Sequence, residues 1–169
     1  MKTQQLAALK KSFVNPAKTT IAAVLSLFAA RVWGLQEAYW APISAIVVMQ
    51  STLGAALTVS WQRLVGTALG SAAGALLSIC FGTNIAAFGA GILVMGLLCA
   101  ALRLDKAAYR FAGITLTVIM LVVRAEPAWA AALHRFYEVS LGILVGVIVT
   151  ALWPEQQASH AGTAIKSAE

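Results

Sequence analysis

The sequence predicts an all-α integral membrane protein with six transmembrane helices, arranged as an inverted repeat of two three-helix halves. Three observations point to this fold class. Of the 169 residues, 60% are hydrophobic and only 11% are charged, and the mean hydropathy is +0.84. Apolar runs of near-spanning length recur along the chain, and polar or basic residues separate them. A soluble domain of this size needs a larger charged surface, so lipid is the predicted surrounding of most side chains.

The first segment, residues 1–17, is predicted to be cytoplasmic or interfacial and separate from a transmembrane domain over residues 18–153. It carries polar and basic side chains, and Asn15-Pro16 is typical of a turn or a helix start. The apolar run after Lys18 is similar to the core of a secretory signal. Because further apolar segments follow it, we interpret this run as the first span. Residues 154–169 form a predicted cytoplasmic polar tail.

Breaks in hydrophobicity define the six predicted spans. Gln36 and Glu37 close span one, residues 82–84 are a turn signal, and the charged stretch 103–110 precedes span five. Pro127 suits the first position of a long final helix. The predicted spans are Lys18–Leu35, a short run from Trp40 to Gln50, Leu64–Phe81, Ile85–Leu102, Phe111–Val123 and Phe136–Trp153.

The basic residues give the predicted orientation, because Lys and Arg accumulate in the cytoplasmic loops of membrane proteins. With the N-terminus inside, nine of the twelve basic residues fall on the inner side. The remaining three, Arg31, Arg124 and Arg135, fall on the outer side. The sequence therefore predicts a multi-pass protein with both termini in the cytoplasm.

A shift of 72 residues relates the two predicted halves. It aligns Arg63 with Arg135, residues 70 and 74 with 142 and 146, and the short run from Trp40 with residues 112–122. Only four of the eighteen positions from 61 to 78 are identical to their mates, so chance similarity is the alternative. Three spans per copy place the copies in opposite directions across the membrane. In transporters of this plan the substrate site lies near the repeat interface.

Glycines recur on one helix face in both halves. Gly66, Gly70 and Gly74 fall at i, i+4 and i+8, and Gly142 and Gly146 repeat this spacing. Small residues at such positions let helix backbones approach closely in lipid. We predict that these glycines pack helices of the same chain together, and a dimer face or a pore lining is the alternative.

Charged side chains inside the hydrophobic zone are costly, so the few present are candidates for function. Arg31, Arg63 and Arg135 are the candidate substrate-binding residues, because a guanidinium group binds a carboxylate through two parallel hydrogen bonds. Anchoring of helix ends at the interface is the alternative for all three. Glu138 and His134 are the candidate proton-coupling residues, and local charge pairing is the alternative.

The short apolar run has two further candidates for substrate binding at its ends. Interrupted hydrophobic segments at matching places in two halves are a pointer to a transport site. Trp40 opens this segment and is the candidate for stacking on a substrate, with an interfacial aromatic belt as the alternative. Gln50 closes the segment and is one of few neutral polar groups in the predicted core.

The sequence predicts no catalytic residues, no cofactor and no metal site. Two histidines and six acidic residues are scattered among termini and loops, and no phosphate-binding glycine loop is present. Cys80 and Cys99 lie in apolar stretches without CxxC spacing. The net charge of +6 follows from the cytoplasmic flanks, so nucleic acid is not an expected partner. We therefore predict that the protein is not an enzyme.

Two motifs carry a family resemblance: AYWAPISAIVVMQ from Ala38 to Gln50, and RLVGTALG from Arg63 to Gly70. Residues 109–110, 135–146 and 153–154 add matching features in the second half. Together they resemble the membrane module of the fusaric acid resistance and aromatic acid exporter family, over about residues 16–155. The resemblance places the family's tryptophan at Trp40, its polar break at Gln50, and its arginine-glycine motif at Arg63 and Gly66.

The resemblance implies an exporter of aromatic or other weak organic acids in the cell inner membrane, driven by the proton gradient. An organic-anion channel, related to plant aluminium-activated malate channels, and a non-transporting membrane subunit are the alternatives. Larger members carry a cytoplasmic domain and often a second membrane module, which these 169 residues do not include. The expected partners are therefore the lipid bilayer, a small organic anion, and either further copies in a homodimer or higher oligomer, or a partner subunit.

Overall fold

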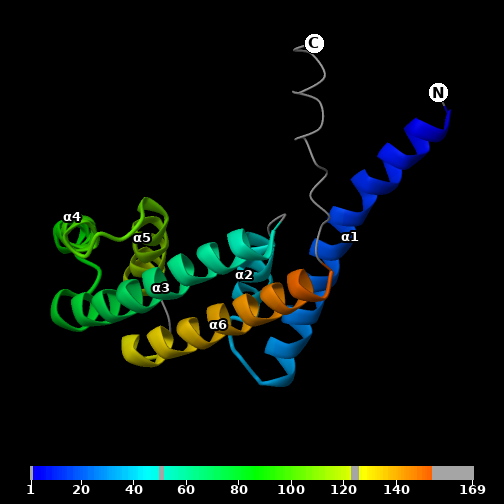
Figure 1. The fold of residues 1–169 in the computed structure, drawn as a ribbon. Coiled ribbons are helices and arrows are strands. Elements are labelled where there is room, and N and C mark those ends of the chain that lie inside the picture. The colour runs from blue at the N-terminus through cyan, green and yellow to red at the C-terminus, as the bar shows by residue number, and fades with distance from the viewer. Residues whose placement is uncertain (1, 50–51, 123–125, 154–169) are drawn as a thin grey trace, which may run out of the picture.

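The computed structural model describes residues 2–49, 52–122 and 126–153, with side chains from residue 14 onward. These residues form six helices and no strand, so the predicted all-α fold is confirmed (Figure 1). The helices are α1 (Lys2–Val32), α2 (Trp40–Val48), α3 (Leu53–Phe81), α4 (Ile85–Ala101), α5 (Lys106–Leu121) and α6 (Ala128–Leu152).

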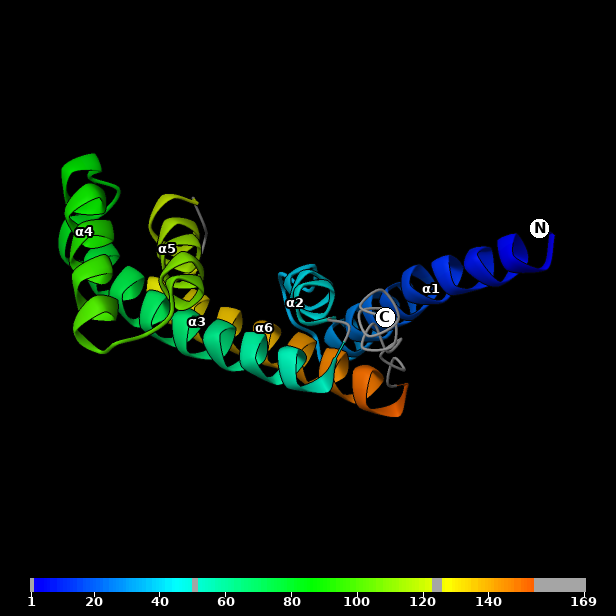
Figure 2. The same cartoon turned by 45° about the horizontal axis from the view of Figure 1, so that its top comes forward.

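The long helices α3 and α6 lie side by side and form the centre of the fold (Figures 1 and 2). Helices α4 and α5 flank one end of this pair, and α1 and α2 flank the other end. Helix α3 packs against α5, whereas α6 packs against α2. The second helix of each predicted half therefore contacts the third helix of the other half.

The glycines of α3 and α6 lie where these contacts are closest. A Cβ atom at Gly66 or Gly70 would collide with the backbone of α5, and one at Gly142 would collide with the backbone of α2. At Gly74 and Gly146 the nearest atom of the neighbouring helix would lie 3.1 Å from such a Cβ. Glycine therefore sets how closely α3 approaches α5 and how closely α6 approaches α2.

Helix α1 crosses the boundary between the predicted N-terminal segment and the first predicted span, and the division itself stays a prediction. It continues through Pro16 without an interruption. The hydroxyl groups of Thr19 and Thr20 donate to the carbonyl oxygens of Asn15 and Pro16, at 3.1 and 2.8 Å. The prediction of a break was wrong because Asn-Pro is only a local turn preference, and the helix-forming alanines and lysines on both sides outweigh it. The cytoplasmic location of residues 1–17 stays a prediction.

Helix α3 begins at Leu53, well before the predicted start of span three at Leu64. Thr52 explains this start, because its hydroxyl accepts a hydrogen bond of 3.2 Å from the backbone N–H of Ala55. Asn84 caps α4 in the same way, accepting from two backbone N–H groups of its first turn. Between them Gly82, with a φ of +60°, ends α3.

Among the described residues, two helices are long and apolar enough to cross a membrane: α3 with 29 residues and α6 with 25. Helix α4 is apolar but has only 17 residues. The nine residues of α2 rise about 13 Å, well short of the roughly 30 Å of a hydrocarbon layer. The number of spans, six, and the inverted repeat therefore stay predictions.

In a soluble domain the large apolar side chains are mostly buried, whereas here small side chains are buried and many large apolar ones are exposed. Small residues, mostly alanines, make up much of the buried hydrophobic core. Large apolar side chains point outward, with exposed fractions between 63% and 83% for Phe28, Trp61, Ile85, Leu97 and Leu152. An apolar surface of this extent is typical of a protein that contacts lipid or another apolar partner.

Candidate functional site

Polar and charged side chains gather inside the helix pack, where α2 meets α3, α6 and the loop over residues 33–39. Arg63 is 6% exposed, Arg135 is 2% exposed and Glu138 is fully buried. Burial of charges in an apolar protein is costly unless they have partners, so a set of this kind marks a functional candidate. We call this set the buried polar cluster, and its members are Glu37, Trp40, Ser44, Arg63, Arg135 and Glu138.

Arg135, Trp40 and Glu37 form the centre of the cluster. The guanidinium carbon of Arg135 lies 2.9 Å from the centroid of the Trp40 ring. Its Nη1 atom lies 3.9 Å from Oε2 of Glu37, and Nε1 of Trp40 donates to the same oxygen at 3.1 Å. An aromatic ring and a carboxylate thus surround one guanidinium group, so the positive charge of Arg135 has two partners inside the protein.

Glu138 extends the cluster along α6. Its Oε1 atom accepts a hydrogen bond of 2.8 Å from the backbone N–H of Glu37. Its Oε2 atom is buried and has no hydrogen-bond partner among the described residues. A carboxyl group so placed can take up a proton or accept a hydrogen bond from a ligand.

Arg63 reaches the same cluster from α3. Its Nε atom donates to Oγ of Ser44 at 3.2 Å, and Ser44 in turn donates to the carbonyl oxygen of Trp40 at 2.8 Å. Its guanidinium carbon lies 4.9 Å from the ring centroid of Phe111 in α5. Each arginine therefore stacks on an aromatic ring that comes from a helix of the other predicted half.

The structure brings only some of the candidate residues together. Trp40, Arg63, Arg135 and Glu138 belong to the cluster. Arg31 lies exposed in the last turn of α1, and within the described part of the chain no hydrogen bond or ion pair joins its side chain to the cluster. Gln50 lies outside the described residues.

His134 pairs away from the cluster. Its Nδ1 atom lies 3.2 Å from Oε2 of Glu126, and 40% of its side chain is exposed. It lies one helical turn before Glu138 on α6, so the two candidates share a helix face.

Glu37 and Ser44 are members that the sequence reasoning missed. Glu37 was interpreted only as part of a polar connection between spans. The signal that could have found it is its spacing, because an acid three residues before Trp40 lies within reach of the indole N–H. Ser44 lies four residues after Trp40, on the same face of α2.

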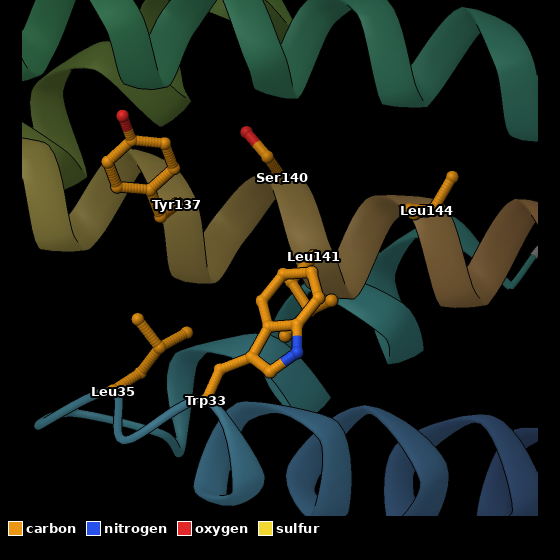
Figure 3. A pocket seen from close by; sticks show the side chains of 6 residues that line it. All are labelled: Trp33, Leu35, Tyr137, Ser140, Leu141 and Leu144. Carbon is orange, nitrogen blue, oxygen red and sulfur yellow. The ribbon is translucent and has the colours of Figure 1, made fainter.

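A pocket of about 480 Å³ lies between the 33–39 loop and α6, and its lining residues are separate from the members of the cluster (Figure 3). Trp33 and Leu35 extend from the loop, and Tyr137 and Ser140 extend from α6. Leu141 and Leu144 complete the lining. A second pocket of about 150 Å³ lies between α3 and the loop that joins α4 to α5, and includes Arg103 and Asp105. The two pockets occupy corresponding places in the two predicted halves.

Comparisons with known proteins agree with the motifs in the sequence. The family model described as fusaric acid resistance protein-like matches residues 23–149, a range that contains the whole buried polar cluster. A relative from Escherichia coli K12, named "Uncharacterized transporter YdhK", is 31% identical over 163 residues. The protein of the same name from Escherichia coli O157:H7 matches equally.

The match to these relatives covers 89% of this chain and 24% of theirs, so the chain spans about a quarter of their length. No solved structure matches the chain. The family match, in contrast, extends over well more than half of the chain and confirms the resemblance of its motifs. The chain belongs to the fusaric acid resistance protein-like family.

Proposed function

We propose that the chain is a membrane transporter module that exports aromatic or other weak organic acids across the cell inner membrane, driven by the proton gradient. The observation that carries this proposal is the buried polar cluster, in which two arginines, a tryptophan and two carboxylates meet between α2, α3 and α6. The family and the transporter-named relatives support it. This function is transport and involves no catalysis.

Arg135 and Arg63 supply the positive charge for the substrate carboxylate, and Trp40 supplies a ring for its aromatic part. A guanidinium group stacked on an indole keeps its edge available for a carboxylate, as the contact with Glu37 illustrates. The neighbouring pocket of about 480 Å³ accommodates the apolar part of a small ligand.

Glu138 is the proposed proton-coupling residue. With both carboxylates ionised, the two arginines and two glutamates of the cluster have no net charge. A proton on Glu138 makes the cluster positive by one unit and so strengthens anion binding from the cytoplasm. Release of this proton to the cytoplasm before the anion leaves on the outer side weakens anion binding again, so that one inward proton is exchanged for one outward anion. His134 is proposed to pass protons between the Glu126 side of α6 and Glu138. The electrical component of the gradient drives an anion outward by about 2.3 kcal/mol per 100 mV.

We also propose that the module has six spans and an inverted repeat, with both termini in the cytoplasm. Exchange of α1 with α4, α2 with α5 and α3 with α6 converts every helix contact among the described residues into another observed contact, which supports this proposal. The large apolar side chains on the surface favour assembly in the bilayer with a second copy or a partner subunit.

Reconstitution tests the proposed function. Purified protein in proteoliposomes is expected to move radiolabelled benzoate, with a rate that rises when a pH gradient and a membrane potential are imposed. Protein-free liposomes provide the background rate. A current of channel magnitude under voltage clamp would contradict a carrier, and no protein-dependent flux of any aromatic acid in a panel would contradict transport.

A further inference from the structure

We infer that Glu37 is a built-in competitor of the transported anion. Its carboxylate occupies the place beside Arg135 that the carboxylate of the substrate takes, and substrate binding displaces it. This inference rests on the proposed function, because it names the residue that regulates the same site. It assigns to Glu37 a role that neither the motifs of the sequence nor the family indicated.

The position of Glu37 fits this role. Its Oε2 atom lies 3.9 Å from Nη1 of Arg135 and accepts the indole hydrogen bond of Trp40 at 3.1 Å. These are the two groups that an aromatic acid would use, one for its charge and one for its ring. A second carboxylate in this place therefore excludes the first by charge repulsion and by space.

Glu37 can also leave the site, whereas Arg135 cannot. The side chain of Glu37 is 24% exposed and that of Arg135 only 2% exposed. Glu37 belongs to the 33–39 loop, whose second residue, Gly34, has a positive φ of +69°. A short loop moves at lower cost than a packed helix, since fewer buried contacts are lost. The carboxylate can thus withdraw to the surface while the arginine stays in place.

Withdrawal of Glu37 connects anion binding to Glu138. The backbone N–H of Glu37 donates to Oε1 of Glu138. The other carboxylate oxygen of Glu138, Oε2, has no hydrogen-bond partner among the described residues. When the loop moves, this buried carboxylate loses the N–H that stabilises its charge, so a proton stabilises it instead. One loop therefore carries both the competitor and the partner of the proton site.

The same loop forms one wall of the neighbouring pocket. Trp33 and Leu35 face Tyr137 and Leu141, which lie on either side of Glu138 along α6 (Figure 3). A loop movement that removes Glu37 from Arg135 also changes the width of this pocket. The apolar part of the substrate and its carboxylate are therefore admitted by one movement.

The other half of the molecule lacks this arrangement. The shift of 72 residues places Tyr109 at the position of Glu37 and Gly66 at the position of Glu138. Arg63, the mate of Arg135, donates to the neutral hydroxyl of Ser44. Of the two arginines Arg63 and Arg135, only Arg135 therefore has an internal carboxylate that competes with the substrate.

The test is benzoate binding to the purified full-length chain in detergent, measured by calorimetry at constant pH. In the variant Glu37→Gln the amide oxygen can still accept from Trp40 and the backbone N–H to Glu138 is kept, but the competing charge is lost. We expect benzoate to bind about tenfold more tightly than to the wild type. The affinity for uncharged benzamide should be the same in this variant and in the wild type. The matched control is Asp105→Asn, an exposed acid whose carboxylate accepts a hydrogen bond from the amide of Gln62, and its benzoate affinity should equal that of the wild type.

A second variant covers the case in which Glu37→Gln does not fold. Glu37→Asp keeps the charge but shortens its reach, and it should bind benzoate more tightly than the wild type and less tightly than Glu37→Gln. Equal or weaker binding by the folded Glu37 variants, with binding by the wild type intact, would overturn the inference and leave the proposed function standing. No benzoate binding by either the wild type or the variants would overturn both.

Discussion

The indole of Trp40 contacts two groups of opposite charge at the same time. Its face lies against the guanidinium group of Arg135, and its N–H donates to the carboxylate of Glu37. Cation–π contacts are strongest where water is absent, and Arg135 is almost completely buried. The buried guanidinium group of Arg135 therefore already has an aromatic ring and an internal carboxylate as neighbours.

The first prediction is that benzoate affinity depends on the protonation of Glu138. Since a proton there removes one negative charge near Arg135, benzoate affinity of the wild type should rise as pH falls through the titration of Glu138. The variant Glu138→Gln cannot titrate, so its benzoate affinity should be high and independent of pH over the range in which benzoate itself stays ionised. Calorimetric titrations at several pH values provide the measurement. A pH dependence that survives in Glu138→Gln would assign the coupling to another group.

Among the helices, α2 lies close to α6 because Gly142 of α6 has no side chain. A Cβ at Gly142 would collide with the backbone of α2, whereas Gly89 of α4 has no atom within 4 Å of such a Cβ. Alanine is intrinsically the better helix former by about 1 kcal/mol. The cost of Gly142→Ala thus comes from the helix contact alone.

We predict that Gly142→Ala lowers the free energy of unfolding by about 1–3 kcal/mol, because α2 must move away from α6. Gly89→Ala is the matched control and should be neutral or slightly stabilising. Thermal unfolding in detergent compares the two variants. Equal melting temperatures would show that the approach of α2 to α6 can relax at no cost.

A buried lysine in the middle of α1 contacts the C-terminal end of α6. Nζ of Lys18 donates to the carbonyl oxygen of Trp153 at 2.8 Å and lies 5.7 Å from the Trp153 ring centroid. This contact satisfies a carbonyl at the C-terminal end of α6, where a positive charge also suits the helix dipole.

Replacement of this lysine is the next prediction. Lys18→Met keeps the apolar stem but removes the donor, and should lower the free energy of unfolding by about 1–3 kcal/mol. Lys106→Met, at the exposed first position of α5, should change stability much less. Denaturation curves recorded under identical detergent conditions provide the comparison. If the two substitutions have equal effects, Lys18 does not hold α1 to α6.

Across the whole molecule, the apolar runs and the polar, glycine and proline residues that interrupt them predicted much of the architecture. The helix type, the approximate position of α4 and α6, and the short α2 between Trp40 and Gln50 all follow from apolar runs and their punctuation. The start of α3 and the continuity of α1 do not, since each depends on how a local signal at Thr52 or Pro16 competes with its neighbours.

The site was only partly predictable for a similar reason. Charged residues are scarce in this apolar chain, and Arg63, Arg135 and Glu138 were predicted as candidates because burial of a charge in an apolar surrounding is costly. Glu37 was missed because its role depends on a contact with Glu138, 101 residues away, which no local pattern encodes. Arg31 met the same criterion as the others, yet its helix face turns the side chain outward.

If the buried polar cluster binds the transported anion, as proposed, benzoate efflux from proteoliposomes depends on Arg135. At equal protein incorporation, Arg135→Gln should lower the efflux rate about tenfold or more, because the buried carboxylates lose their countercharge. Arg110→Gln, at an exposed position of α5, should leave the rate unchanged. Wild-type efflux by Arg135→Gln at normal protein yield would contradict the account.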